Sequence, residues 1–114
     1  MVVYICGPIS LGGQLSTPEE VERNIWAFNN LAQNLRADDI EVLNPVEVPP
    51  QPDWKSYMVL TIPMVCAADV IVCLPGWRLS RGARLEVFLA LELEKLVCSP
   101  GELATYLKGI EIGS

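Results

Sequence analysis

The feature that most constrains the fold is the alternation of short, unbroken apolar runs with segments of helical periodicity. Four runs have the length and composition of buried strands, and they span residues 2–6, 40–43, 69–74 and 95–98. The turn residues that close them are Gly7-Pro8, Asn44-Pro45, Pro75-Gly76 and Ser99-Pro100. Residues 110–112 could add a fifth, final short strand.

The segments between these runs are predicted to be helices. A first helix follows the capping candidates at Ser16-Thr17 and runs to about Ala37. The others are expected to begin near residues 52–54, near Ser80, and at residues 99–102 with an end at Lys108. Proline allows two further predictions: Pro63 should break or restart the second helix, and the four prolines of residues 45–52 should form a stiff loop without regular structure.

Strands that alternate with helices through short loops predict a parallel sheet with helices on both faces. We therefore expect a flavodoxin-like (Rossmann-like) three-layer α/β sandwich with a four- to five-stranded parallel sheet, formed by residues 1–114 as a single domain. Ligands of such sheets bind beyond the carboxyl ends of the strands, near the point where strand order reverses. Gly7, Pro8 and Ile9 are thus predicted to face the same crevice as residues 76–82.

Composition narrows the class of partner. With 14 acidic and 8 basic residues the formal charge is −6, which disfavours nucleic acid polymers and anionic membranes and favours a small ligand. No apolar run is long enough to span a membrane, and we expect a cytoplasmic protein. Half of the residues are hydrophobic, which suggests that a second subunit covers apolar surface in a homodimer or a larger homo-oligomer.

Reactive side chains are few. The four cysteines form no CxxC pair, lie in apolar sequence and are interpreted as reduced core residues. Histidine is absent, which excludes histidine-based triads and the commonest metal ligand. We expect no metal and no cofactor, so acid–base chemistry must fall to carboxylates, tyrosine or water.

Glu86 is the carboxylate that stands out. At about 100° per residue, the neighbours on its own helix face are small or apolar: Gly82, Ala83, Leu89, Ala90 and Leu93. The opposite face carries Arg81, Arg84, Glu92 and Lys95. Glu86 is therefore predicted to point inward, which is costly unless a partner or an opening stabilises its charge. The alternative to a catalytic role is a structural glutamate bonded to backbone groups or an arginine.

The helix start before Glu86 is a candidate anion site. Free N–H groups and the helix dipole at Ser80-Arg81-Gly82 favour an anion such as phosphate, although a serine in this place can simply be a cap. Three of the eight cations, Arg78, Arg81 and Arg84, lie in this segment and favour an anionic ligand. Arg84 could instead belong to a solvated helix face.

Several motifs together resemble the nucleoside 2-deoxyribosyltransferase superfamily over most of the chain. They are Tyr4-Ile5-Cys6-Gly7-Pro8-Ile9, Asp69 at a strand start, and Ser80-x-Gly82-x-x-x-Glu86. The chain is most similar to a small phage and bacterial branch related to deoxynucleoside 5′-monophosphate N-glycosidases. Residues shared with that branch are Asn44-Pro45, Trp54-x-x-Tyr57-Met58 and Leu74-Pro75-Gly76-Trp77.

This resemblance implies an enzyme in which Glu86 attacks the anomeric carbon of a nucleoside or nucleotide and holds the sugar as an ester. Water or another base then accepts the sugar, as in retaining double displacements. By the same resemblance, Tyr4 lies near the nucleophile and residues 7–9 line the sugar pocket. Ser80 and Gly82 would bind the 5′-phosphate.

One position departs from the family pattern. Relatives usually carry an acidic residue eight positions before Asp69, where it assists the leaving base, and this chain has Thr61 there. Thr61 is thus expected in the substrate pocket without the acid function. Asp53 or Asp69 could supply the acid instead, but Asp69 fits better as a tie between the strand start and neighbouring backbone.

The aromatic residues near the predicted site allow two interpretations. Trp54, Tyr57 and Trp77 could stack on a nucleobase, or each could pack in the core or against another subunit. By composition alone, Tyr4 on a central strand would also be a core residue. The alternative to the enzyme is a catalytically weak protein that binds or sequesters a nucleotide.

Overall fold

The computed structural model describes residues 1–9 and 17–113. Its elements in chain order are β1 (Val2–Cys6), α1 (Pro18–Ala37), β2 (Glu41–Leu43), α2 (Trp54–Ala67), β3 (Val70–Cys73), α3 (Arg81–Glu92), β4 (Leu96–Cys98) and α4 (Pro100–Gly113). Two short 3-10 turns, η1 (Pro45–Glu47) and η2 (Trp77–Leu79), lie in the connections. Within the described residues, none of the helices combines the length and the apolar content that crossing a membrane requires.

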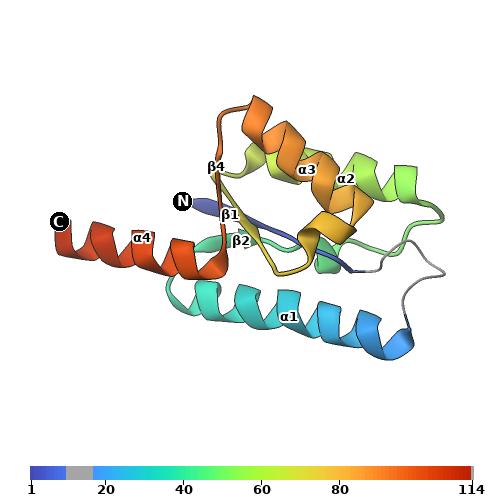
Figure 1. Ribbon diagram of the computed structural model, residues 1–114, viewed down its shortest axis with the longest axis horizontal. Coiled ribbons are helices and arrows are strands. Elements are labelled where there is room, and N and C mark those ends of the chain that lie inside the picture. The colour runs from blue at the N-terminus through green and yellow to red at the C-terminus, as the bar shows by residue number, and fades with distance from the viewer. Residues whose placement is uncertain (10–16, 114) are drawn as a thin grey trace.

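The four strands form one parallel sheet in the order β2-β1-β3-β4. Tyr4 on the central strand β1 lies between Leu43 of β2 and Ile71 of β3. Helices α1 and α4 cover one face of the sheet, and α2 and α3 cover the other (Figure 1). The predicted three-layer α/β fold is therefore confirmed, with four strands.

The two faces of β1 serve different layers because successive side chains of a strand point to opposite sides. Val3 and Ile5 pack in the cluster that holds Phe28 of α1 and Leu103 of α4. Tyr4 and Cys6 instead join the cluster formed with α2 and α3. This alternation directs the two chemically active side chains of β1 toward α3, the helix that carries Glu86.

Two predictions of secondary structure are wrong at prolines. Helix α2 continues through Pro63, and both Pro63 and Val59, the residue whose carbonyl loses its helical partner, are exposed. The loop of residues 45–52 holds one regular turn, η1, in which Pro45 occupies the first helical position that proline favours.

The predicted strand at residues 110–112 is also wrong. These residues continue α4, which runs to Gly113. A strand needs hydrogen bonds from a neighbouring strand, whereas a helix supplies its own. In Figure 1 the end of α4 extends beyond the sheet, away from the strands of the described residues.

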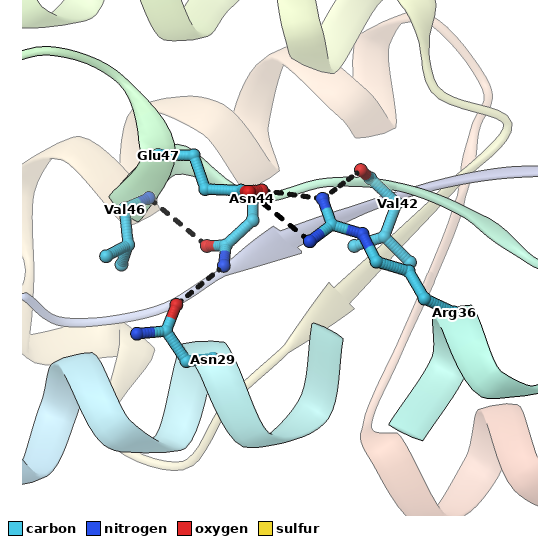
Figure 2. A network of polar contacts seen from close by, with 6 residues as sticks. All are labelled: Asn29, Arg36, Val42, Asn44, Val46 and Glu47. Carbon is cyan, nitrogen blue, oxygen red and sulfur yellow. Dashed lines mark hydrogen bonds and ion pairs between the residues drawn. The ribbon is translucent and has the colours of Figure 1, made fainter. Parts of the chain in front are cut away.

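Asn44 fastens the carboxyl end of β2 to α1 (Figure 2). It is 2% exposed, accepts a hydrogen bond from the Val46 N–H at 3.1 Å and donates to Asn29 Oδ1 at 3.0 Å. Beside it, Arg36 of α1 pairs with Glu47 at 2.6 Å and donates to the Val42 carbonyl at 2.9 Å. These contacts hold the backbone of residues 44–47 against α1.

We predict that Asn44→Ala lowers the free energy of unfolding by about 1–3 kcal/mol, since it leaves the Val46 N–H and the Asn29 amide without their partner. Urea denaturation checks this value. Asn34→Ala on the exposed side of α1 is the matched control and should change stability little. Equal effects of the two substitutions would contradict the role of the Asn44 network.

Candidate active site

A cavity of about 490 Å³ opens at the carboxyl end of the sheet, between α2 and the start of α3. The described residues that line it are Tyr4, Gly7, Ile9, Pro45, Gln51, Trp54, Tyr57, Met58, Ser80, Arg81, Gly82, Ala83 and Glu86. The turn after β1 and the start of α3 thus line one cavity, as the predicted topology requires. Its volume is in the range typical of small-molecule sites.

Glu86 lies on the inward face of α3 and is 5% exposed. Tyr4 Oη donates a hydrogen bond to Glu86 Oε2 at 2.5 Å. The Cys6 thiol donates to Glu86 Oε1 at the longer distance of 3.6 Å. Both donors come from the same face of β1, so the central strand binds the carboxyl group through two side chains. Glu86 also lines the cavity.

Burial and hydrogen bonding act in opposite directions on the pKa of Glu86. Loss of solvent raises this pKa, and hydrogen bonds from Tyr4, Thr61 and Cys6 partly lower it again. Burial, together with the nearby carboxylate, raises the pKa of Tyr4, which therefore keeps its proton and remains a donor. The Thr61 hydroxyl also contacts Met58 Sδ at 3.8 Å.

The start of α3 contributes backbone and side-chain groups to the cavity. Ser80 caps the helix, because its Oγ accepts a hydrogen bond from the Ala83 N–H at 3.2 Å. Gly82 allows α2 to come close: a Cβ there would lie 3.2 Å from Met58 Sδ and 3.4 Å from Trp54 Nε1. Ser80 is thus a cap and a lining residue at once.

The three arginines of this segment differ in position. Arg81 lines the cavity and lies over the Trp54 ring, with its guanidinium carbon 3.8 Å from the ring centroid. Arg78 lies over the Trp77 ring at 4.8 Å, and Arg84 donates to the Arg78 carbonyl at 2.8 Å. Arg81 is therefore the arginine that a ligand in the cavity would meet.

Three residues predicted for substrate binding are not among the described lining residues. Pro8 is buried, and Thr61 is completely buried next to Glu86. Trp77 packs against the core cluster between the sheet and helices α2 and α3. Thr61 is therefore in hydrogen-bond contact with Glu86 and is not one of the described residues that line the cavity.

The two aspartates considered as alternative acids are bonded to backbone. Asp53 caps α2 and accepts from the Ser56 N–H at 2.8 Å. Asp69 Oδ2 accepts from the Val2 N–H at 2.8 Å, and the Asp69 N–H donates back to the Val2 carbonyl. The predicted structural role of Asp69 is confirmed. Among the described lining residues, Glu86 is the one carboxylic acid.

Sequence reasoning missed the contact of Cys6 with Glu86 and the lining side chains of Gln51 and Met58. The signal for Cys6 was its spacing of two from Tyr4, which places both on one face of the strand. No comparable signal exists for Gln51, which lies in the irregular segment before α2. In the described part of the chain, no three His, Cys, Asp or Glu side chains gather to hold a metal ion.

Residues 1–99 match the family model described as "Domain of unknown function (DUF4406)". The chain belongs to this family. No curated protein sequence matches the DUF4406 chain significantly.

A solved structure of a 2-desoxiribosyltransferase from Leishmania mexicana is similar to the DUF4406 chain, with a TM-score of 0.61 and 20% sequence identity. The similarity covers 86% of this chain and 62% of that one, so the DUF4406 chain spans less than two thirds of the length of the protein it matches. At this identity the similarity shows a shared fold.

The raised pKa of Glu86 predicts how stability depends on pH. Because the folded state binds this proton more tightly than the unfolded chain, the contribution of Glu86 is fully favourable below the ordinary pKa of 4.5. It is lost as pH rises through the raised, folded-state value. In urea denaturation at a series of pH values, wild type should therefore lose stability relative to Glu86→Gln as the pH rises above about 4.5.

The matched control is Glu22→Gln on the exposed side of α1. Its stability should run parallel to that of wild type across the same pH range. Any loss of packing or of hydrogen bonds in Glu86→Gln adds an offset that does not vary with pH. A difference between wild type and Glu86→Gln that stays constant with pH would therefore show that Glu86 titrates normally.

Proposed function

We propose that this DUF4406 domain cleaves or transfers the N-glycosidic bond of a (deoxy)nucleoside or its 5′-monophosphate, with Glu86 as the nucleophile. The observation that carries the proposal is a buried carboxyl group beside a cavity of about 490 Å³, held by a hydrogen bond of 2.5 Å from Tyr4. The fold shared with a 2-desoxiribosyltransferase supports the same class of reaction.

In the proposed first step, a Glu86 oxygen attacks the anomeric carbon and the bond to the base breaks, with its electron pair leaving on the base nitrogen. The product is a glycosyl ester of Glu86. Tyr4 bonds Oε2 strongly, whereas Oε1 has the longer contact with Cys6, which favours Oε1 as the attacking atom. Water or a second base then attacks the same carbon and restores the carboxylate, with retention of configuration. The proton that this acceptor releases balances the proton that the departed base takes up from solvent.

A 5′-phosphate would be bound at the start of α3. The backbone N–H groups of the first helical turn have no acceptor within the helix and can therefore donate to an anion. The helix dipole also favours negative charge at this end. Arg81 adds a positive charge at the same place in an otherwise acidic protein. Trp54 and Tyr57, which also line the cavity, are the candidates for contact with the base.

A second candidate function is nucleotide sequestration without efficient turnover. It is favoured by the described cavity lining, which offers no carboxylic acid besides Glu86 to protonate a leaving base. It is also favoured by Thr61, which stands where the resemblance to the nucleoside 2-deoxyribosyltransferase superfamily leads one to expect an acidic residue. Thermal stabilisation by a nucleotide, with no base released on long incubation, would support this function over catalysis.

We predict that Glu86→Gln abolishes release of free base from a panel of nucleosides and 5′-monophosphates, because a neutral amide is not a nucleophile. Chromatographic analysis of the products measures this. Glu22→Gln, the same chemical change on the exposed side of α1, should retain wild-type release. Turnover that persists in Glu86→Gln would refute the proposed nucleophile.

Tyr4→Phe should reduce turnover roughly tenfold, because the free energy lost with one hydrogen bond to a charged group corresponds to about that factor in rate. It should also move the acidic limb of the pH–rate profile to higher pH. The reason is that the Tyr4 hydrogen bond lowers the pKa of Glu86, so that its loss lets burial raise this pKa further. A lower rate with an unmoved profile would count against electrostatic support of Glu86 by Tyr4.

A further inference from the structure

The outward face of α3 is apolar, although a helix in an outer layer ordinarily shows polar residues to solvent. Phe88 is 61% exposed, Leu91 59% and Leu85 38%. Further exposed apolar side chains belong to elements that contact α3, namely Val59 and Leu60 of α2 and Leu79 of η2. Exposed apolar surface of this extent is typical of an interaction site.

The residues of this face are symmetric about Phe88. Leu85 and Leu91 lie three residues before and after it, and Arg84 and Glu92 lie four before and after. Positions three and four apart share one side of a helix, so the order along the outer face is cation, apolar, aromatic, apolar, anion. Both charged residues are exposed, and in the described part of the chain neither forms an ion pair.

The order of these charges is unfavourable for the isolated helix. The dipole favours acidic residues in the first turn and basic residues in the last, yet α3 has neither. Arg84 instead lies near the positive end and Glu92 near the negative end. The helix dipole therefore does not account for this order of charges, whereas an external partner with the opposite order would.

We propose that α3 pairs antiparallel with α3 of a second copy of this chain, around a twofold axis that passes by Phe88. Such an axis brings each position after Phe88 opposite the equivalent position before it in the other copy, as in isologous dimers. Leu85 then meets Leu91 of the second copy. Arg84 meets Glu92 of the second copy, and the symmetry forms this ion pair twice.

Sedimentation equilibrium over a concentration series tests the pairing. Wild type should be a dimer with twice the chain mass of 12.6 kDa. Phe88→Glu places two carboxylates together at the axis and should raise the dimer Kd about a hundredfold or more. Trp26→Glu, at another strongly exposed aromatic residue, on α1, should leave the Kd unchanged.

Charge reversal gives the decisive comparison. Arg84→Glu or Glu92→Arg alone places like charges opposite each other and should raise the Kd on the order of tenfold. The double variant restores opposite charges and should return the Kd close to the wild-type value. Each reversal places a charge where the helix dipole favours it, so a weakened dimer is not explained by a weakened helix.

Three results would overturn the proposal: a monomeric wild type, a dimer that is insensitive to Phe88→Glu, or a double variant that dimerises no better than the single ones. Circular dichroism and thermal unfolding of each variant establish that it is folded before its Kd is compared. Because all substituted side chains are exposed, they should leave the fold intact.

Discussion

The hydrogen bond between Tyr4 and Glu86 is the interaction on which the candidate site depends. It joins the centre of the sheet to α3 across a buried layer, so the carboxyl group is positioned by a strand that is paired on both sides. A buried carboxyl group without such a donor would be very costly. Cys6 and Thr61 complete its surroundings, and the cavity is left to one side of it.

Much of the fold follows from the sequence, because the strand runs and the helical segments differ in period and in length. The exceptions are instructive. Pro63 is compatible with α2 because Val59, whose carbonyl loses its helical partner, is exposed, and this depends on the packing of α2 and not on its sequence. Residues 110–112 have an apolar, strand-like sequence, but they continue α4 in the structure.

The site was predictable to the extent that it follows from periodicity. Glu86 was found from its small and apolar helical neighbours, and the crevice from strand order. The environment of Thr61 and Trp77 could not be found this way, because it depends on how α2 and the turn before α3 pack against the sheet. The contact between Cys6 and Glu86 required the structure for the same reason, as it joins residues 80 positions apart.

The close approach of α2 to α3 at Gly82 bears on both the shape of the cavity and the position of Glu86. The side chains of Met58 and Trp54 rest against α3 at this glycine, where a Cβ would lie 3.2 Å from Met58 Sδ and 3.4 Å from Trp54 Nε1. Glu86 is one turn further along the same helix. A side chain at position 82 would therefore have to displace groups on α2 or shift α3 itself, and a shift of α3 would carry the carboxyl group of Glu86 away from Tyr4.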